Sequence, residues 1–478
     1  MEHYSAFAPS IGACAEQATV YAPWDRSPIA TVDVVDSNQA DQILETAFAI
    51  YQDKSRWLPP AKRIEVLEKT AQLMAARSEE LAVEAAREGG KPLPDSKVEV
   101  ARAIDGMHSC VEIMRTEAGQ EIPMNLNAAS AHHMALTRKY PIGVVLAFSA
   151  FNHPLNLIVH QVGPALASGC PAIIKPALDT PLSCMRFVEM LHQAGLPEGY
   201  VQAINLGDHE VAGQMVGDPR VAFFSFIGSG EVGWMLRSKL APGARCALEH
   251  GGIAPVIVAA DADIDDALPL MAKGGFYHAG QVCVSVQRVY ADQSIAQRIA
   301  EGLAELGNDM KVGDPTEADT EVGPLIRPAE VDRVEAWVQE AVDAGAQLVS
   351  GGQRLSDTAY QPTVLLNPPA DAKVSAHEVF GPVICVYGFD DIDAAIAQAN
   401  AGPYSFQSAV FSQNINTALH CYHQLEAAAV MINNHTAFRV DWMPFAGLKQ
   451  SGHGVGGIPY TYEDMQVDKL MVVRSPSL

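Results

Sequence analysis

Long apolar runs are missing from this chain of 478 residues. The longest candidates, such as the run that begins at Gly143, are far shorter than the roughly 20 residues of a membrane-spanning helix. The N-terminus carries neither a basic segment nor an apolar core, so we expect no signal or transit peptide. These absences argue against a helical membrane protein, and the length predicts two or three domains.

Basic side chains are also scarce. Lys and Arg total 32 against 56 Asp and Glu, which gives a formal net charge of -24. Such a molecule repels nucleic acid and anionic membrane surfaces, so neither is an expected partner. Hydrophobic residues nevertheless make up 48% of the chain, which is enough for a large core and excludes a disordered protein.

Closely spaced cysteines are absent as well. The eight cysteines are scattered, and no two lie within three positions of each other, which excludes a disulfide framework and a zinc ribbon. The pairs His132-His133 and His420/His423 have no convergent carboxylates or cysteines, so we expect no metal site. A reduced, cytoplasmic enzyme is the simplest interpretation.

Apolar strands alternate with helical segments from Ile142 onward. This alternation predicts parallel sheets that are covered by helices on both faces. A first set of strands ends at Glu249 and a second begins near Pro255, so we expect two α/β domains. The expected strands are 142–149, 171–175, 200–204, 221–226, 245–249, 255–260, 383–389 and 408–412.

Helical segments are expected at 155–169, 181–195, 267–273 and 331–345. Upstream, apolar residues at spacings of three and four predict one helix from Lys62 to Glu88, which Gly89-Gly90 ends. Two polar segments with scattered apolar residues, 125–138 and the tail from Tyr460, are expected to be strands that pair outside the main body.

Three side chains are candidates for covalent chemistry. Cys283 lies among small residues in HAGQVCVSVQR, although a lone cysteine is more often a buried thiol. Asn152 follows the strand 142–149 and could donate to an oxyanion, although asparagine before a turn is ordinary. Glu249 ends a strand, where burying a carboxylate is costly, although it could also cap a turn or reach solvent.

Two further features suit a dinucleotide. Residues Gly228 to Gly233 follow the strand 221–226, open a helix and fit the pattern G-x-G-x-x-G in the required context. Lys175 ends a strand, where it could meet a ribose or phosphate or be simply exposed. In such folds the acid at the end of the next strand holds the ribose, and that acid is Glu249. Its role as ribose ligand or as catalytic base stays open on the residues alone.

Together these residues resemble the aldehyde dehydrogenase superfamily, from about Pro23 to Val473. Asn152 in FNHPL is similar to the oxyanion asparagine of that family, Glu249 in LEHGG to its general base and Cys283 in GQVC to its nucleophile. The resemblance therefore favours the base for Glu249. The other matching motifs are Lys175-Pro176, Phe226-Ile227-Gly228-Ser229, Glu378 with Phe380-Gly381-Pro382, and Pro444-Phe445-Ala446-Gly447 with Lys449, Ser451 and Gly452, where Ala446 replaces a Gly.

The resemblance implies an α/β fold of the aldehyde-dehydrogenase type, with two Rossmann-like domains and a small β extension for oligomerisation. Residues 1–124 and 139–250 would form the dinucleotide-binding domain and 251–435 the catalytic domain. Residues 125–138 and 460–478 would be the oligomerisation strands. A homodimer or homotetramer is the expected assembly.

The resemblance also implies NAD or NADP as cofactor. The residues expected to bind it are Lys175, Ser149, Phe151, Gly228, Ser229, Val232, Glu378 and Phe380. Leu178 stands where NAD-preferring members often carry Glu, so a 2′-phosphate is not repelled there and NADP is permitted. Phe151 in place of a common Trp and Ile253 in place of a common Lys predict small packing effects.

The expected reaction is oxidation of a small aldehyde to its acid, through a thioester on Cys283 that a water activated by Glu249 hydrolyses. A coenzyme-A-acylating relative and a catalytically silent protein on this fold are the alternatives. The presence of Glu249 argues against the first, because such relatives commonly lack the base. The joint presence of Cys283, Glu249 and Asn152 argues against the second.

Arg439 and His453 are the candidate substrate residues, because the region around the late motif lines the aldehyde tunnel in the family. Arg439 lies among apolar neighbours, where a guanidinium needs an anion. An aldehyde that carries a carboxylate, sulfonate or phosphate could supply one. The alternative is a salt bridge from Arg439 to Asp441 or another acid.

Overall fold

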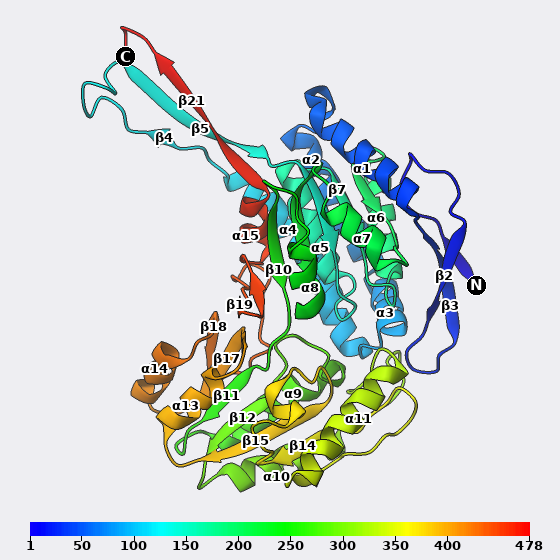
Figure 1. Ribbon diagram of the computed structural model, residues 1–478, viewed down its shortest axis with the longest axis vertical. Helices are drawn as coiled ribbons and strands as arrows, with labels where there is room; N and C mark the ends of the chain where they lie inside the picture. Colours follow the sequence, from blue (N-terminus) through cyan, green and yellow to red (C-terminus); the bar gives the residue numbers. More distant parts are fainter.

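The computed structural model describes residues 1–478. The chain forms two halves that lie one above the other, and a long ribbon that carries the C-terminus projects from the upper half (Figure 1). Each half has its own sheet and its own large apolar core, of 40 and 37 buried residues respectively. The expected α/β class is confirmed.

The first half is built on a six-stranded sheet in the order β20-β10-β9-β6-β7-β8, parallel except for the edge strand β20. Its strands are β6 (Val144–Phe148), β7 (Ala172–Lys175), β8 (Val201–Ala203), β9 (Val221–Ile227), β10 (Arg245–Glu249) and β20 (Gly452–His453). The helices α5 (Asn156–Ser168), α6 (Leu182–Gln193), α7 (His209–Val216) and α8 (Gly230–Arg237) connect them. Every residue of β6 is buried, as its continuous apolar sequence predicts for a central strand covered on both faces.

The N-terminal segment adds helices and a small sheet to the first half. The small sheet, in the order β1-β3-β2, contains β1 (Glu2–Tyr4), β2 (Glu16–Tyr21) and β3 (Pro28–Val34). The helical elements are α1 (Ser37–Gln52), the short 3-10 helix η1 (Lys54–Arg56), α2 (Pro60–Ala76), α3 (Ser78–Gly89) and α4 (Leu93–Thr116).

The single helix expected from Lys62 to Glu88 is wrong, because α2 and α3 are separate helices that meet at Arg77. Glu79 and Glu80 follow the break, and acidic residues in a first turn favour the positive end of a helix dipole. The Arg77 guanidinium donates to Glu80 at 3.0 and 2.7 Å. The predicted end of the segment is confirmed, since Gly90 caps α3 with a φ of +76°.

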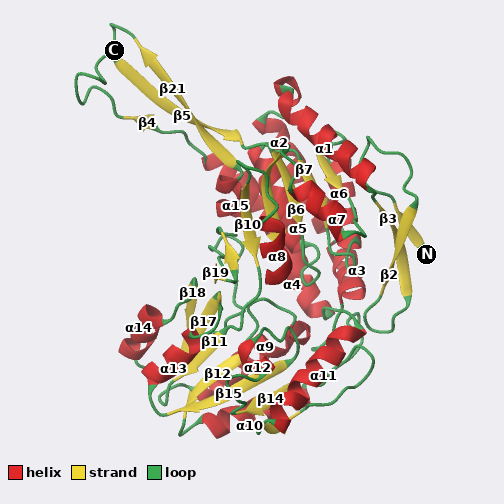
Figure 2. Ribbon diagram, viewed as in Figure 1, coloured by secondary structure: helices red, strands yellow, loops and turns green.

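The second half is built on a seven-stranded sheet in the order β13-β14-β15-β12-β11-β17-β18, parallel except for β13. Its strands are β11 (Pro255–Val258), β12 (Arg288–Asp292), β13 (Gln347–Ser350), β14 (Thr363–Leu366), β15 (Val383–Phe389), β17 (Gln407–Phe411) and β18 (Ala429–Ile432). Its helical elements are α9 (Ile264–Phe276), the 3-10 helix η2 (Tyr277–Gly280), α10 (Ala296–Asp309), α11 (Pro328–Asp343), α12 (Lys373–Ala376), α13 (Ile392–Asn400) and α14 (Ile415–Gln424). The helices flank this sheet in the lower part of Figure 2.

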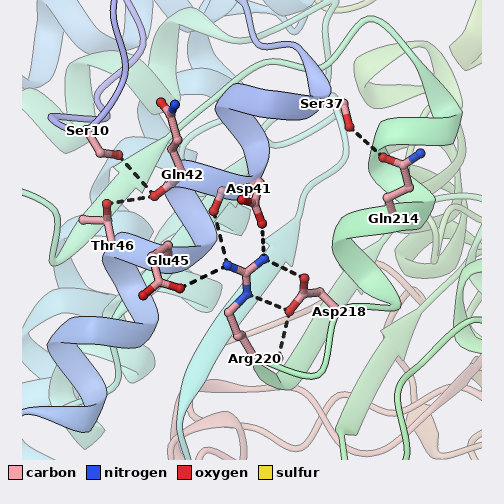
Figure 3. A network of polar contacts seen from close by, with 9 residues as sticks. All are labelled: Ser10, Ser37, Asp41, Gln42, Glu45, Thr46, Gln214, Asp218 and Arg220. Carbon is pink, nitrogen blue, oxygen red and sulfur yellow. Dashed lines mark hydrogen bonds and ion pairs between the residues drawn. The ribbon is translucent and has the colours of Figure 1, made fainter.

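Polar contacts fasten α1 to the sheet of the first half (Figure 3). Arg220, just before β9, donates to Asp218 at 2.9 and 2.7 Å and to Asp41 of α1 at 2.5 Å. Its second amino group lies 3.3 Å from Glu45. One guanidinium thus joins residues far apart in the sequence.

The projecting ribbon is an antiparallel sheet in the order β21-β5-β4. Its strands are β4 (Glu121–Ile122), β5 (His133–Pro141) and β21 (Gln466–Arg474), and β5 pairs with β21 from Pro141↔Gln466 to His133↔Arg474. A two-stranded sheet of β16 (Tyr404–Ser405) and β19 (Leu448–Lys449) and the helix α15 (Ile458–Asp464) complete the chain.

The bounds of these strands differ from the expected 125–138 and 460–478. Residues 125–132 form a turn in which Asn127 and Asn125 accept from the backbone of Ser130 and His132 at 3.0 and 2.9 Å. Asparagine favours such turns because its side chain satisfies nearby backbone donors. The tail is still helical in α15 up to Asp464. None of the helices combines the length and apolar character that crossing a bilayer requires.

Candidate active site

A cavity of about 1120 Å³ lies where the two halves meet. Phe148, Lys175, Ile227 and Glu249, the last residues of β6, β7, β9 and β10, line it. Parallel sheets bind ligands at this edge. Every candidate site residue named from the sequence lines the cavity except His453. The predicted residues from distant parts of the chain therefore come together in one place.

Cys283 lies on a tight loop after η2. His278, Ala279 and Gly280 have φ values of +51°, +53° and +69°, a left-handed run that is costly for the first two. A Cβ atom on Gly280 would lie 2.1 Å from the carbonyl oxygen of Gly381, so only glycine fits there. The loop thus holds the thiol at the cavity wall.

The thiol of Cys283 is mostly protonated in this environment. Burial raises its pKa to about 12, and the carboxyl groups of Glu378 and Glu249 raise it further, while Arg439 acts in the opposite direction. A thiolate therefore forms only if a base removes the proton during the reaction.

Asn152 lies beside the loop that carries Cys283. Its side chain is 5% exposed, and its amide nitrogen donates to the carbonyl oxygen of Gln281 at 3.0 Å. The Gln281 side chain donates to His278 and Pro324 at 3.1 Å and accepts from the Ile326 amide at 2.9 Å. Since an amide group has two N–H donors, one remains for another acceptor.

Glu249 is the carboxylate that lines the cavity near Cys283 without a hydrogen bond or ion pair of its own. Burial raises its pKa to about 7, although the positive charge of Arg439 opposes the shift. A group with this pKa can accept and release a proton near neutral pH.

Glu378 lies on the second half of the molecule and faces the same space. Its carboxylate accepts from the Gly252 amide at 3.1 Å, and burial raises its pKa to about 8. A Cβ atom on Gly251 would lie 1.9 Å from this carboxylate, so the carboxylate occupies the space that a side chain on residue 251 would take. Phe380 has a φ of +47°, and its ring contacts that of Phe151 edge-on, at a centroid distance of 5.8 Å.

The glycine-rich turn at 228–233 joins β9 to α8. A Cβ atom on Gly233 would lie 1.9 Å from the His250 ring, so the missing side chain allows the helix to pack on β10. Nδ1 of His250 lies 2.9 Å from the carbonyl oxygen of Gly228 and fixes the turn to the strand. The backbone of Gly228 and Ser229 thus borders the cavity at a helix N-terminus.

The remaining cofactor candidates gather at the ends of β6 and β7. Burial lowers the pKa of Lys175 to about 8, and its amino group lies 3.1 Å from the carbonyl oxygen of Pro176. The hydroxyl of Ser149 is buried and has no hydrogen-bond partner. Leu178 and the next residue, Asp179, both line the cavity, and the Asp179 carboxylate lies 3.8 Å from Arg327. A long cleft with an unpaired hydroxyl, a lysine, a glycine-rich turn and Glu378 fits a dinucleotide.

Arg439 lines the cavity without any hydrogen bond or ion pair, and its buried Nη1 atom has no partner. Its guanidinium carbon lies 3.8 Å from the centroid of the Phe445 ring. Burial lowers its pKa to about 10, while Glu249 and Asp441 oppose the shift. A guanidinium in this state has donors for an anion.

The alternative pairing of Arg439 with Asp441 is absent. Asp441 accepts from Arg102 at 3.0 and 2.6 Å, and Nε2 of His160 lies 2.6 Å from the same carboxylate. Burial opposes ionisation of Asp441, yet His160 and Arg102 hold its pKa well below the usual range. Arg102 also lines the cavity, and nothing local in the sequence distinguishes it from other helical arginines.

His453 was expected near the substrate, and the structure contradicts this. It lies opposite Leu248 at the outer edge of the sheet, in β20, and is exposed. The neighbour of β20 in the chain, Gln450, lines the cavity instead. An edge strand directs some of its side chains to solvent. The position of His453 next to a motif in the sequence does not reveal which way its side chain points.

The comparisons with known proteins agree with this geometry. The profile of the aldehyde dehydrogenase family matches residues 11–471. The chain belongs to this family. It is 36% identical over 460 residues to the 3-sulfolactaldehyde dehydrogenase of Priestia aryabhattai, covering 96% of this chain and 95% of the relative. It is 33% identical to the lactaldehyde dehydrogenase of Methanocaldococcus jannaschii, covering 96% and 97%.

Solved structures of the family have the same architecture. Aldehyde dehydrogenase 21 from Physcomitrella patens, in complex with the reaction product succinate, matches with a TM-score of 0.94 and 33% identity, over 99% of this chain and 98% of that one. Glyceraldehyde-3-phosphate dehydrogenase from M. jannaschii, complexed with NADP, matches with a TM-score of 0.92 and 32% identity, over 96% and 100%. The predicted family and its fold are therefore confirmed, and the chain is an oxidoreductase of the aldehyde dehydrogenase type.

Proposed function

We propose that this enzyme oxidises a small, anionic aldehyde to its carboxylic acid with NAD or NADP, through a thioester on Cys283. The observation that carries the proposal is that Cys283, Glu249, Asn152 and Arg439 line one cavity. Together they supply a nucleophile, a base, an oxyanion donor and an anion-binding group.

Cys283 attacks the aldehyde carbon as a thiolate. Glu249, with a pKa of about 7, takes the thiol proton directly or through a water, and the positive charge of Arg439 favours the thiolate. The developing oxyanion receives hydrogen bonds from the free N–H of Asn152 and from the Cys283 amide. One such donor typically contributes about 3 kcal/mol to the stability of the transition state.

The ends of β6, β7 and β9 would hold the dinucleotide. Lys175 and Ser149 would hold its adenosine side, the turn at Gly228 and Ser229 its phosphates, and Val232 would pack beside them. Glu378 would accept from the hydroxyls of the nicotinamide ribose, and Phe380 and Phe151 would flank the ring. When bound, the dinucleotide supplies one chemical function, which is to accept the hydride from the tetrahedral adduct.

Hydrolysis then releases the acid. Glu249 first releases the thiol proton to solvent; it then takes a proton from a water, which attacks the thioester carbon, and Asn152 stabilises the second oxyanion. The bond to sulfur breaks, the acid leaves and loses its remaining proton to solvent, and the proton held by Glu249 returns to the Cys283 thiolate or to solvent. The same base thus serves both half-reactions.

Arg439 supports an anionic substrate. Its guanidinium has no acidic partner, so a carboxylate, sulfonate or phosphate a few carbons from the aldehyde satisfies its donors. Arg102 lies in the same wall but already pairs with Asp441. The similarity to 3-sulfolactaldehyde dehydrogenase and to a structure that holds succinate supports this substrate class.

Leu178 supports the use of NADP beside NAD, because no carboxylate at this position repels a 2′-phosphate. The similarity to a structure complexed with NADP agrees with this. We place the enzyme in the cytoplasm as a homodimer or homotetramer, with residues 125–138 and 460–478 as the oligomerisation segment. The dinucleotide-binding part comprises residues 1–124 and 139–250, and the catalytic part 251–435.

A coenzyme-A-acylating activity is the second candidate for the fate of the thioester. Glu249 favours hydrolysis, because transfer to an external thiol needs no activated water. The deciding experiment is rapid mixing of Glu249→Gln with aldehyde and NAD(P). We expect Glu249→Gln to slow NAD(P)H formation and to slow deacylation further, so that a burst slower than that of the wild type precedes slow turnover, while Cys283→Ala shows no burst and binds the cofactor normally.

Three outcomes would contradict this assignment. Weakened cofactor binding by Glu249→Gln with unchanged deacylation would make Glu249 a ribose ligand. If the wild type forms acyl-coenzyme A as its main product, and faster than free acid, the acylating activity is established. If Cys283→Ala retained more than a few per cent of turnover, the reaction would not depend on a thioester at Cys283.

A further inference from the structure

Glu249 has a defined position although no hydrogen bond holds its carboxylate. A Cβ atom built on Gly456 would lie 1.8 Å from Oε1 of Glu249 and 2.9 Å from its Cδ atom. Real Cβ atoms do not approach other atoms this closely, so the carboxylate fills the volume that a side chain on residue 456 would occupy.

The backbone of Gly456 is fixed by an isolated antiparallel bridge to Phe445. The Phe445 amide donates to the carbonyl oxygen of Gly456 at 3.0 Å, and the Gly456 amide donates to that of Phe445 at 2.6 Å. The ring of Phe445 in turn lies under the guanidinium of Arg439. One short bridge therefore supports both the anion-binding group and the carboxylate.

The backbone conformation does not explain why residue 456 is glycine. Its neighbours Gly454 and Gly457 have φ values of +82° and +99°, whereas Gly456 is outside this left-handed region. An L-residue such as alanine is therefore compatible with the backbone at 456. The steric demand comes chiefly from the Glu249 carboxylate, with the Phe445 oxygen at a tight 3.0 Å.

We propose that Gly456 is a positioning residue for Glu249, and that its missing side chain forms the slot in which the base rests between proton transfers. This inference rests on the proposed role of Glu249 as the base. The slot covers one side of the carboxylate with backbone, while the other side faces the cavity that holds Cys283.

The slot also affects how readily Glu249 ionises. Burial is what raises its pKa to about 7, and the charged and titratable groups that face it are Arg439 and Cys283. A methyl group at 456 pushes the carboxylate into the wetter cavity, where water stabilises the charged form and the pKa falls. The rate of deacylation depends on ionised Glu249, so the acid limb of its pH profile then moves to lower pH.

The test is Gly456→Ala, compared by rapid mixing and steady-state pH profiles with Gly12→Ala, a control position with no atom within 4 Å of the added Cβ. We expect deacylation to slow roughly tenfold, since misplacing a reacting group by about 1 Å costs up to about 100-fold. The acid limb shifts to lower pH, and cofactor affinity stays near that of the wild type. An unchanged deacylation rate and pH profile would overturn the proposal.

A double-mutant cycle separates the slot from a general packing defect. Glu249→Asp shortens the side chain by one methylene and makes room for a Cβ atom at 456. We therefore expect Gly456→Ala to cost much less in the Glu249→Asp background than in the wild type. If Gly456→Ala slows deacylation equally in both backgrounds, or if the double variant misfolds, the proposal is overturned. Residue 456 is then glycine because of the demands of the local backbone and not because of Glu249.

Comparison of Gly456→Ala with Glu249→Gln separates this inference from the proposed function. If Glu249→Gln leaves deacylation unchanged, the base itself is misassigned. If Glu249→Gln blocks deacylation and Gly456→Ala does not affect it, only the slot is wrong.

Discussion

Arg439 differs from the other arginines that line the cavity, because those have acidic partners. Arg102 pairs with Asp441, Arg327 with Asp179 and Glu330, and Arg333 with Glu330. A guanidinium that is mostly buried on a phenylalanine ring with donors unpaired is unfavourable in the empty site. On the proposed function, an anionic substrate would relieve this cost, and Arg439 would contribute to selectivity for charged aldehydes.

Arg439→Ala should raise KM for succinic semialdehyde far more than for propanal. Loss of a hydrogen bond to a charged group costs roughly 1.5–3 kcal/mol, which corresponds to roughly 10- to 150-fold in kcat/KM. Because Arg439 also acts on the charges of Glu249 and Cys283, a change common to both aldehydes is expected in kcat, and the ratio between the substrates is the readout. Equal losses for the two aldehydes would leave Arg439 with a structural role only.

Leu178→Glu should shift the cofactor preference toward NAD. In the proposed cofactor site, a carboxylate at position 178 would lie beside the adenosine ribose and repel a 2′-phosphate, whereas the adjacent Asp179 lies 3.8 Å from Arg327 in the wild type. Titration of both proteins with NAD and NADP measures the change, and Leu178→Gln serves as the uncharged control. A wild-type enzyme that does not bind NADP would show that other residues set the choice.

At the scale of elements, the site depends on strand ends whose positions are fixed by helices packed outside the sheet. The helix α1 is one of these, and its capping box at Asp36 and Gln39 starts it beside the strand β3. Its inner face packs through Ile43, Leu44 and Ala47. The contacts of Arg220 add a polar connection between this helix and the start of β9 (Figure 3).

Arg220→Ala should lower the free energy of unfolding by about 1 kcal/mol, because two of its three carboxylate partners are well exposed and contribute little each. The measurement is chemical denaturation followed by fluorescence. Arg298→Ala is the matched control, since Arg298 forms one exposed pair with Asp265 and should cost close to nothing. If Arg220→Ala lowers the free energy of unfolding no more than Arg298→Ala does, apolar packing alone holds α1 in place.

At the scale of the whole molecule, the projecting ribbon leaves apolar surface uncovered. Leu470, Met471 and Val472 of β21 are 54%, 51% and 53% exposed. The strand β21 is also an edge strand, which presents unpaired backbone groups to other chains. These exposed apolar residues on an edge strand support the proposed contact with another copy of the chain.

Replacing Leu470, Met471 and Val472 together by lysine should lower the molecular mass in solution toward that of a single chain of 51.1 kDa. Charged side chains on an edge strand oppose pairing, and the strand can still pair with β5. Light scattering coupled to gel filtration measures the mass, and Lys469→Ala is the control in the same strand. An unchanged mass for the triple variant would place the assembly surface elsewhere.

The amino-acid sequence determined the local features of this protein and the identity of its chemistry. The apolar runs at β6, β7, β8, β9, β11, β15 and β17 predicted the strands, because largely continuous burial leaves a signal within a few residues. Cys283, Glu249 and Asn152 stand in motifs of an aldehyde dehydrogenase, and the structure places all three on one cavity. The break at Arg77 was missed, since the apolar stripe continues through it.

Only the tertiary structure decided which side chains meet. Arg102 and Asp441 are 339 positions apart, and their pairing is what leaves Arg439 free, so no spacing of residues 439 and 441 could predict it. His453 lies next to a motif yet faces away from the cavity, because the register of β20 on β10 sets its direction. Gly456, in the loop after β20, accommodates Glu249 at the end of β10, a contact that the chain reaches only after folding. Local propensity acts over a few residues, whereas these contacts depend on packing across the whole molecule.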